Sequence, residues 1–531
     1  MRPLLPLSTL ALPSSTSKTT SRGRNTKGCD SCQRTRHSEV QHRLVHSTCH
    51  LATLFVFAVV LLGVTGTCGW VGWLMYARHN AYAQSVFAPA LVPVPRFVEP
   101  LVPAFVPDSN FSFVQAQADL DVRLQTLNLP PSTLPCDESL SNSTFATRRY
   151  TPLTTSGPYL VAINLYNSQH VIPTLARTLL EVAEFLGPRN VHVSIFENGS
   201  TDNTTLALAH VAAALTAVRV EHTIKSDTRV TDWKRVDRID QLAIYRNVAL
   251  SPVVAGLDDR PFRDVVFIND VFAGPIDVLE LLLQRREQHA DAACAIDWKE
   301  TSGFLSRWGA QSVKMYDNWV TRSITGNMLR NRVDIWNQAR HGIEELYDPG
   351  IDAPSRDRLR RGLPVPVYSC WNGMLALDAE PFTSTRVNPQ ARERIGPVSS
   401  SSAAELRSSH EPTMFRTALN VPGECAASEC KTIARDFWAR GYNRWIIVPT
   451  VRVTYSESVY SHPHLIGIAT RLRNFLQAEA KLPTLPSHLS PTIDWSLPEW
   501  RAPESVVCWS WARGFHIDLP WWRSTKEKPW R

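Results

Sequence analysis

The feature that most constrains the fold is an alternation of short apolar runs with longer amphipathic segments, which begins at Tyr159. Four runs of seven or eight residues have the length and composition of strands buried on both faces: 159–166, 191–197, 264–270 and 292–298. Four longer segments have the length and periodicity of helices: 171–187, 205–217, 241–254 and 275–289. Strands that alternate with helices usually pair in parallel and are covered on both faces. We therefore predict an α/β fold with a Rossmann-like, mostly parallel sheet.

Polar clusters follow three of the predicted strands. They are Glu197–Asp202, Asn269-Asp270 and Asp297-Trp298. In open α/β sheets, ligands bind beyond the carboxyl ends of the strands. The sequence therefore predicts a ligand site at this edge of the sheet.

The first cluster reads Glu-Asn-Gly-Ser-Thr-Asp, from Glu197 to Asp202. Gly199 suits a turn with positive φ, and Ser200, Thr201 or Asp202 can cap the following helix. Capping does not account for Glu197, which ends an apolar strand. A carboxylate there can accept hydrogen bonds from a ribose or a base. We predict that Glu197 and Asp202 bind a nucleotide, with a simply capped connection as the alternative.

The second cluster combines a helical Arg246-Asn247 pair with Asn269-Asp270 at a strand end. Mg²⁺ or Mn²⁺ is commonly held by one or two carboxylates together with substrate phosphates. Asp270 is therefore a candidate metal ligand, and Asn269 is its neutral neighbour. Arg246 is placed to neutralise a diphosphate, and the alternative is that it only covers the sheet.

Further candidates lie at the third cluster and in the later part of the chain. Asp297 is either a catalytic carboxylate or a structural one bound to a backbone amide. Glu429 is a further carboxylate that we assign to the catalytic site. Trp371 and Asn372 are candidates for the acceptor side, where an aromatic ring can stack on a sugar and an amide can bind a hydroxyl. Core packing is the alternative for Trp371.

The N-terminal part of the chain predicts a membrane anchor. Residues 1–50 carry eight Lys/Arg and two acids, and residues 51–76 contain no charge. A bilayer needs about 20 apolar residues. Basic residues before the span favour a cytoplasmic N-terminus. We predict a disordered cytosolic tail at 1–50, a transmembrane signal anchor at 51–76 and a Pro-rich lumenal stem at 77–150.

The rest of the chain is expected to form a catalytic domain at 151–482. A Trp- and Pro-rich extension at 483–531 is expected to pack on it as an irregular segment. The net charge of +7 is supplied mostly by the N-terminal tail, so nothing indicates a nucleic-acid partner.

Two observations are consistent with a lumenal domain. Asn110 and Asn142 begin N-glycosylation sequons within the predicted stem. Six cysteines follow the anchor, which permits up to three disulfides with 15 connectivities. Cys425 and Cys430 are close enough in sequence to pair, but the sequence does not choose among the connectivities.

Taken together, these segments resemble a known family. The chain contains, in this order, the motif E-N-G-S-T-D-x-T, the motif R-N-x-A-L and a strand that ends in an acidic motif. In this order of motifs it resembles nucleotide-sugar glycosyltransferases of the A-type fold. The chain resembles the fungal capsule-associated α-1,3-mannosyltransferase family more closely than it resembles A-type glycosyltransferases in general. The resemblance is carried also by "VVFINDVFAGPIDVLELL", "ACAIDW", "VYSCWNGMLALDAEPF" and "VVCWSWARGFHIDLPWW", and it spans about residues 160–522.

The resemblance implies a Golgi type II membrane enzyme that transfers mannose from GDP-mannose to a mannose-containing glycan. The linkage would be α-1,3 with retention, a divalent metal would assist, and the role would lie in capsule, cell-wall or glycoconjugate synthesis. The acidic motif of A-type enzymes is usually Asp-x-Asp, whereas this chain has Asn269-Asp270-Val271. Two alternatives remain open: another nucleotide-sugar donor, or a non-catalytic polysaccharide-assembly protein on the same fold.

Overall fold

The computed structural model describes residues 97–98, 112–132, 140, 144–227, 231–232, 236–301, 312–330, 343–384, 412–418, 427–460, 487–507 and 526–527. The predicted tail at 1–50 and the predicted anchor at 51–76 lie outside these residues. Within them, no helix combines the length and the apolar character needed to cross a bilayer.

One large sheet organises the domain. Its strands are β1 (Phe97–Val98), β2 (Tyr159–Leu165), β3 (Val191–Glu197), β4 (Glu221–Asp227), β5 (Asp264–Ile268), β6 (Ala292–Thr301), β7 (Ser312–Met315), β8 (Arg322–Ser323), β9 (Val365–Ser369), β10 (Met374–Asp378) and β11 (Trp445–Thr454). The α-helices are α2 (Phe113–Thr126), α3 (Thr144–Thr154), α4 (Ile172–Leu186), α5 (Thr204–Ala217), α6 (Arg238–Leu250), α7 (Pro275–Glu287), α9 (Ala353–Arg360), α10 (Glu380–Thr383), α13 (Glu429–Ala439) and α14 (Glu457–Tyr460).

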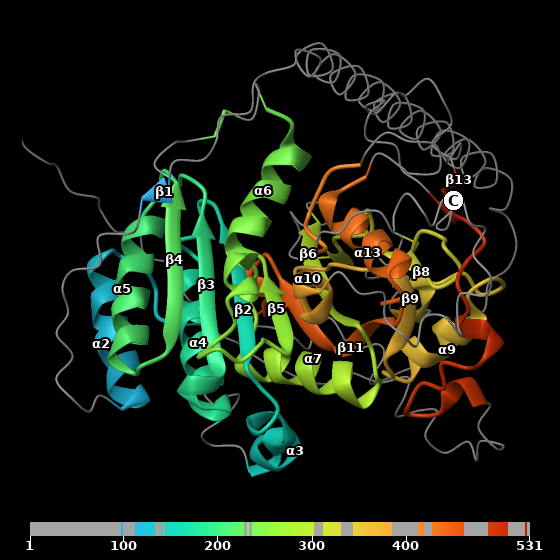
Figure 1. Cartoon of the computed structure of the whole chain (residues 1–531), viewed down its shortest axis with the longest axis horizontal. Coiled ribbons are helices and arrows are strands. Elements are labelled where there is room, and N and C mark those ends of the chain that lie inside the picture. The colour runs from blue at the N-terminus through green and yellow to red at the C-terminus, as the bar shows by residue number, and fades with distance from the viewer. Residues whose placement is uncertain are drawn as a thin grey trace, which may run out of the picture. The chain divides into compact units, whose positions relative to one another are not determined.

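The first half of the sheet matches the predicted parallel arrangement. Strands β4, β3, β2 and β5 lie side by side and pair in parallel (Figure 1). The chain moves from β2 to β4 in one direction and then returns to place β5 on the other side of β2. Because crossovers between parallel strands are right-handed, this reversal places α6 on the face opposite α4 and α5. Ligands bind at such a switch point.

The second half of the sheet corrects the prediction of a mostly parallel sheet. Strand β10 lies between β5 and β6 and is antiparallel to both, and β9 is antiparallel to β11. Only the β6–β11 pair is parallel in this half of the described sheet. The sheet is therefore mixed. The alternation of strands and helices ends at β6, so local periodicity does not reveal how the later strands are inserted.

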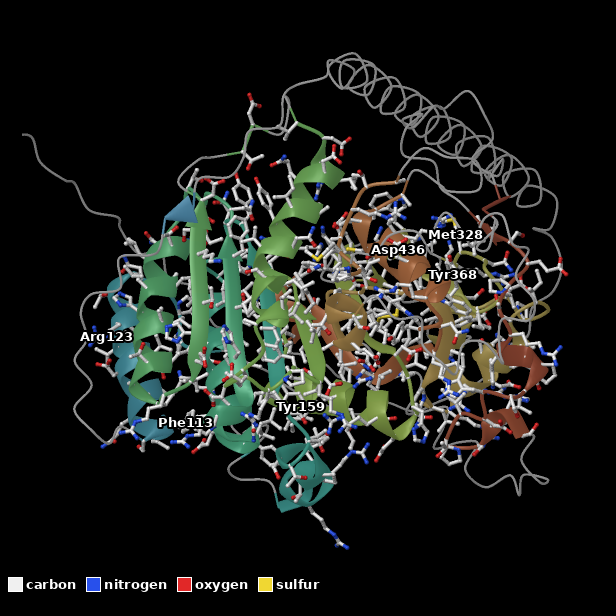
Figure 2. The ribbon with its side chains drawn as sticks, in the orientation of Figure 1. Phe113, Arg123, Tyr159, Met328, Tyr368 and Asp436 are labelled. Carbon is white, nitrogen blue, oxygen red and sulfur yellow. A yellow bond between two sulfur atoms is a disulfide. The ribbon has the colours of Figure 1, made fainter. Side chains whose placement is uncertain are left out.

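The predicted stem at 77–150 is partly folded onto the domain. Helix α2 packs against α4 and α5 and buries Ala116, Leu120 and Leu124. Phe113 and Arg123 mark this helix at one end of the sheet in Figure 2. Strand β1 pairs with β4 and forms the edge of the sheet. The folded domain therefore begins N-terminal to the predicted boundary at residue 151, because an amphipathic helix follows the proline-rich run.

The described part of the C-terminal extension, 487–507, is irregular. It contains the short 3-10 helices η8 (Ser487–Leu489) and η9 (Pro498–Trp500) and the two-residue strand β12 (Val506–Val507), which pairs with β13 (Lys526–Glu527). The fully buried Arg358 guanidinium donates to the carbonyls of His488 and Ser490. Burial lowers the pKa of Arg358 to about 10, so the side chain remains a cation at neutral pH. These bonds fasten the extension to α9.

Candidate functional site

The turn after β3 is held together by its own acidic residues. The carboxylate of the buried Glu197 accepts hydrogen bonds from the Ser200 amide and, at 3.1 Å, from the Thr205 hydroxyl. Asp202 accepts from the Thr204 amide at 3.0 Å and from the Gln169 amide at 3.2 Å. Glu197 therefore has partners in the turn and at the start of α5, and Asp202 has partners at the start of α5 and in the loop that follows β2. These bonds explain Glu197 without a ligand, and nucleotide binding by Glu197 and Asp202 stays a prediction.

Of the three residues that could cap the helix, Asp202 accepts from the first helical amide, that of Thr204, whereas Ser200 bonds elsewhere. Its hydroxyl accepts from the Asn167 amide at 2.8 Å, and the Asn167 side chain accepts from the Thr201 amide at 2.8 Å. Asn167 has a φ of 50°, a conformation that Asn tolerates better than most residues. The loop after β2 and the turn after β3 are thus locked together, side by side at the carboxyl ends of two neighbouring strands.

Arg246 occupies a box built from three distant parts of the chain. Its guanidinium carbon lies 4.3 Å from the centre of the Trp371 ring. Its Nε donates to Glu429 Oε1 at 2.9 Å, and its Nη1 donates to Asn269 Oδ1 at 3.0 Å. Trp371 Nε1 also donates to Asn269 Oδ1, at 3.2 Å. Four of the predicted site residues therefore form one connected cluster, which we call the arginine box: Arg246, Asn269, Trp371 and Glu429.

The arginine box is buried, and this changes the roles of two of its members. Trp371 is 2% exposed and packs on Phe267 and Phe415, so the ring is core packing and is not open for stacking on a sugar. Glu429 is 1% exposed and accepts also from Ser428 and from the Cys430 thiol. With these partners, the Glu429 carboxylate stabilises the buried Arg246 charge and is not exposed to a substrate.

Cys430 and Asn247 support the same box. Cys430 is a free, buried thiol, and Cys425, the suggested partner, lies outside the described residues. Burial raises the pKa of Cys430 well above its ordinary value. The Asn247 side chain donates to the Phe415 carbonyl at 2.8 Å and accepts from the Phe415 amide at 2.9 Å. Asn247 therefore positions Phe415 beside Arg246, and its amide is occupied at both ends.

Asp270 is the predicted site residue that is least engaged by the protein. It follows Asn269 at the end of β5 and remains partly exposed. Burial raises the pKa of Asp270 above its ordinary value, although His170, Arg246 and Arg238 act in the opposite direction. Within the described ranges, no group of three or more His, Cys, Asp or Glu residues is arranged to hold a metal ion. A metal at this position would therefore depend on Asp270 together with ligands from the substrate and water.

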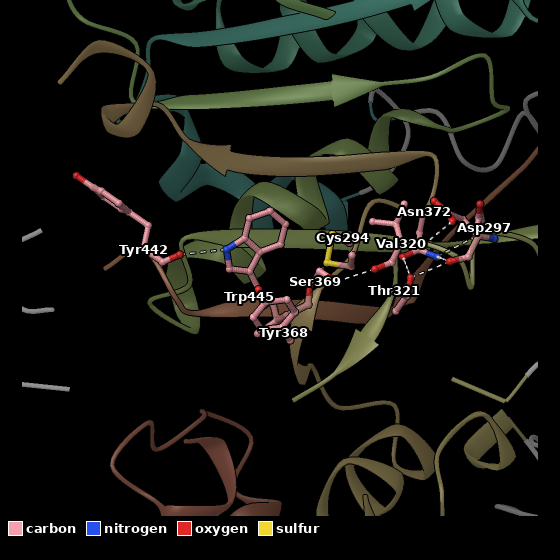
Figure 3. Close-up of a disulfide and its surroundings, with 12 residues drawn as sticks. Cys294, Asp297, Val320, Thr321, Tyr368, Ser369, Asn372, Tyr442 and Trp445 are labelled. Carbon is pink, nitrogen blue, oxygen red and sulfur yellow. Dashed lines mark hydrogen bonds between the residues drawn. A yellow bond between two sulfur atoms is a disulfide. The ribbon is translucent and has the colours of Figure 1, made fainter. Parts of the chain in front are cut away.

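Asp297 and Asn372 form a second buried pair, shown in Figure 3. Asn372 Nδ2 donates to Asp297 Oδ1 at 3.0 Å, and Asn372 Oδ1 accepts from the Thr321 hydroxyl at 2.9 Å. Asp297 Oδ1 also accepts from the Asp317 amide at 3.2 Å. Both side chains are fully buried. Asp297 is thus a carboxylate bound to a backbone amide, which was one of its two predicted roles. Both ends of the Asn372 amide are bonded inside the protein, so this side chain is not open to an acceptor substrate.

A cluster of acidic groups surrounds this pair. Asp297 Oδ2 is buried without a hydrogen-bond partner among the described residues. Burial, together with the neighbouring Asp317, raises the pKa of Asp297 to about 7. Burial also raises the pKa of Asp317. Burial raises the pKa of Tyr455, and the nearby Asp297, Asp270 and Asp317 raise it further. Tyr455, which follows β11, therefore lies near Asp270 after β5 and Asp297 on β6.

A disulfide fixes the relative position of these segments. Cys294 on β6 is bonded to Cys370, and both residues are fully buried (Figure 3). Cys294 lies three residues before Asp297, and Cys370 lies two residues before Asn372. The bond therefore joins the two stretches of chain that carry the Asp297–Asn372 pair.

The structure thus brings together most of the predicted residues, but not all. The arginine box and the Asp297–Asn372 pair are adjacent through the neighbours Trp371 and Asn372, and Asp270 adjoins Asn269. Glu197 and Asp202 bond within a separate turn. The sequence reasoning missed Asp317 and Tyr455. Asp317 follows a short segment of alternating polar and apolar residues, and Tyr455 follows a strand that looks like ordinary core, so neither gave a signal.

Comparison with known proteins identifies the family. The family described as Cryptococcal mannosyltransferase 1 matches residues 158–436. The α-1,3-mannosyltransferase CMT1 of Cryptococcus neoformans var. neoformans serotype D is 29% identical over 394 residues, which cover 72% of this chain and 75% of that protein.

Similar solved structures include a mannosyltransferase from Pyrobaculum calidifontis in complex with GDP-Man and Mn²⁺. It has 11% identity and a TM-score of 0.28, with 70% of this chain and 74% of that chain covered. Staphylococcus aureus TarS has 12% identity and a TM-score of 0.27, and 61% of this chain spans only 40% of that one. The family assignment rests on the two sequence matches. The matched range covers more than half of the chain and includes every candidate site residue, so this glycosyltransferase belongs to the Cryptococcal mannosyltransferase 1 family.

Proposed function

We propose that the chain transfers a mannosyl residue from GDP-mannose to a mannose-containing glycan, in an α-1,3 linkage and with retention. The observation that carries this proposal is the family match over residues 158–436, which spans both β5 with Asp270 and β6 with Asp297. The name of the cryptococcal relative supplies the sugar and the linkage. The product would enter a capsule, cell-wall or glycoconjugate polysaccharide.

Asp270 is the residue that we assign to the donor diphosphate. It is partly exposed at the switch point of the sheet, and no side chain among the described residues forms a hydrogen bond with it. Asn269, held by Arg246 and Trp371, fixes the backbone from which Asp270 extends. Arg246 then acts as a positioning residue, because its contacts are inside the protein.

A divalent cation fits this donor set. Mg²⁺ and Mn²⁺ accept a shell made of one protein carboxylate, substrate phosphates and waters. Among the described residues the carboxylate of Asp270 forms no ion pair, although His170, Arg246 and Arg238 act on its pKa from farther away, and a bound cation would supply a direct partner. When bound, the ion would stabilise the charge that develops on the leaving GDP. The chain itself contributes the Asp270 carboxylate, on a backbone that the bonds of Asn269 hold in place.

The same proposal includes a location in the Golgi membrane with the catalytic domain in the lumen. It is supported by the uncharged stretch at 51–76 and the basic residues before it. A buried disulfide adds support, because disulfides persist in oxidising compartments and are rare in the cytosol.

The test is a donor panel with the purified full-length chain. GDP-mannose, UDP-glucose and UDP-xylose are each offered with α-mannobiose and Mn²⁺, with and without EDTA, and the labelled product is measured. We expect transfer from GDP-mannose alone and its loss with EDTA. Faster transfer from UDP-glucose or UDP-xylose than from GDP-mannose would show that the donor is another nucleotide sugar. Absence of transfer and of donor hydrolysis with all three would support the non-catalytic alternative.

A further inference from the structure

Two lysines face each other across the β6–β7 strand pair, next to the candidate donor site. Lys299 on β6 lies directly opposite Lys314 on β7. Directly opposite residues of an antiparallel pair share one face, with Cβ atoms about 4.5–5.5 Å apart. The neighbouring pair, Trp298 and Met315, is on the other face and is buried. The strand pair is therefore fixed to the core by one face, and its other face presents an exposed Lys299 and a partly exposed Lys314.

This arrangement opposes stability, because like charges directly opposite each other in a sheet repel. Among the described residues, neither Lys299 nor Lys314 has a carboxylate within ion-pair distance. Lysines on edge strands discourage pairing with other chains. That reason covers Lys314 but not Lys299, because β6 is an interior strand of the described sheet. Sequences depart from such local rules mainly at functional sites, and two adjacent ammonium groups suit a ligand with two negative charges.

An aromatic ring connects the lysine pair to the surroundings of Asp270. The Nζ of Lys299 lies 4.4 Å from the centre of the Tyr316 ring, which is a cation–π contact. The Tyr316 ring packs on the Tyr455 ring, with the two centres 4.9 Å apart. Burial raises the pKa of Tyr316, and among the nearby charges Asp270 raises it further whereas Arg238 lowers it. Tyr316 therefore lies close to Asp270, and it is 44% exposed, so a ligand can reach this side of the site.

The backbone holds the lysine pair beside the buried Asp297. The Tyr316 amide donates to the Asp297 carbonyl at 3.0 Å, and the Asp317 amide donates to Asp297 Oδ1 at 3.2 Å. Lys299 lies two residues after Asp297 on the same strand, a step of roughly 6–7 Å. Side chains on strands are positioned more precisely than side chains on loops. The two ammonium groups are therefore fixed with respect to the acidic cluster of the site.

We propose that Lys299 and Lys314 bind the diphosphate of the nucleotide-sugar donor, which Asp270 approaches from β5. This inference rests on the proposed function, which supplies the donor. In the transfer, the bond between the sugar C1 and the diphosphate oxygen breaks and its electron pair stays on that oxygen. The acceptor hydroxyl oxygen forms the new bond to C1 and releases its proton to solvent. The leaving diphosphate thus gains a negative charge, and ammonium groups already in place beside it stabilise that charge.

The test measures nucleotide binding without transfer. The full-length chain is titrated calorimetrically with GDP in EDTA, so that a metal ion does not contribute. Lys299→Met and Lys314→Met keep the length of the side chain and remove its charge, and Lys299→Arg and Lys314→Arg are the controls that keep the charge. Each Met variant should bind GDP about tenfold more weakly, because a hydrogen bond to a charged group is lost. The Arg variants should bind GDP like the wild type.

Two other ligands locate the effect on the diphosphate. Inorganic pyrophosphate should show the same loss of affinity as GDP, whereas guanosine, which lacks the diphosphate, should bind all the proteins equally. In 1 M NaCl, where charges are screened within about 3 Å, the difference between the Met variants and the wild type should shrink. The melting temperature of Lys314→Met should not fall below that of the wild type, because the repulsion between the two lysines is removed.

Equal GDP affinity of the wild type and both Met variants would overturn this inference and leave the proposed function intact. The same holds if GDP affinity is unchanged and only the KM for the acceptor rises, because the lysines would then face the acceptor. Absence of GDP and pyrophosphate binding by the wild type in EDTA would also overturn it. Lysine-dependent binding of GDP without any mannosyl transfer would count against the proposed function and not against the lysine pair.

Discussion

Two buried carboxyl groups on or next to β6 make a matched pair. Asp297 is the sixth of the ten residues of β6 and lies beside Asn372, whereas Asp291 immediately precedes the strand and accepts from the Arg444 amide at 2.8 Å. Burial raises the pKa of each to about 7, with Asp317 adding to the effect at Asp297. The two residues share an electrostatic situation, but only Asp297 adjoins the candidate site.

This pair predicts how stability depends on pH. From about pH 4 to pH 7, the folded protein keeps protons on Asp291 and Asp297 that the unfolded chain has lost. The free energy of unfolding therefore falls as pH rises through this window, and each carboxyl group contributes about 1.4 kcal/mol for every pH unit that it spans. Asp297→Asn and Asp291→Asn should each flatten the curve of melting temperature against pH between about 4.5 and 7.5. Curves parallel to that of the wild type would refute the raised pKa values.

For single residues, the sequence predicted where a side chain lies in the fold better than what that side chain does there. The rule of strand ends placed Asn269 and Asp270 correctly just after β5, whereas Asp297 lies within β6, which continues to Thr301. It did not show that Trp371 is enclosed, because burial of an aromatic ring depends on residues far away in the chain. The bonds of Glu197 inside its own turn were not foreseen for the same reason: they need the three-dimensional path of the turn.

At the scale of helices and strands, the disulfide that joins β6 to the loop after β9 gives the clearest prediction about stability. The Cys294–Cys370 bond closes a loop of 76 residues and holds the Asp297–Asn372 pair. Replacing both cysteines by Ala should lower the free energy of unfolding by about 2–4 kcal/mol. Urea unfolding with and without dithiothreitol measures this. The wild type should become less stable in the reductant, and the double variant should not respond to it. Equal stability of the two proteins without reductant would contradict a stabilising role.

The helices and strands before residue 300 follow from local patterns, but the later strands do not. Predicted runs at 159–166 and 191–197 agree with β2 and β3 almost residue for residue. Strand β10 is short and apolar and gives no local sign that it enters between β5 and β6. Its position is set by pairing between segments about 80 to 110 residues apart in the sequence. Non-local pairing of this kind is invisible to periodicity.

For the whole molecule, the structure predicts where the chain can be shortened. A chain that begins at residue 140 loses α2 and β1, including the buried side chains of Leu120 and Leu124. Burial of one Leu contributes about 1.5–3 kcal/mol. We therefore expect this chain to be several kcal/mol less stable than one that begins at residue 90. Chemical denaturation of both chains measures the difference, and equal midpoints would show that α2 is dispensable.

The central claim is that this chain transfers mannose from GDP-mannose through Asp270. The most direct measurement is the initial rate of transfer to α-mannobiose by the wild type, Asp270→Ala and Glu221→Ala. Glu221 is a matched, exposed carboxylate at the amino end of β4. Loss of a group that stabilises leaving-group charge should cost on the order of 10²–10³ in rate for Asp270→Ala. Glu221→Ala should retain the wild-type rate. A folded Asp270→Ala protein that transfers mannose at the wild-type rate would contradict this claim.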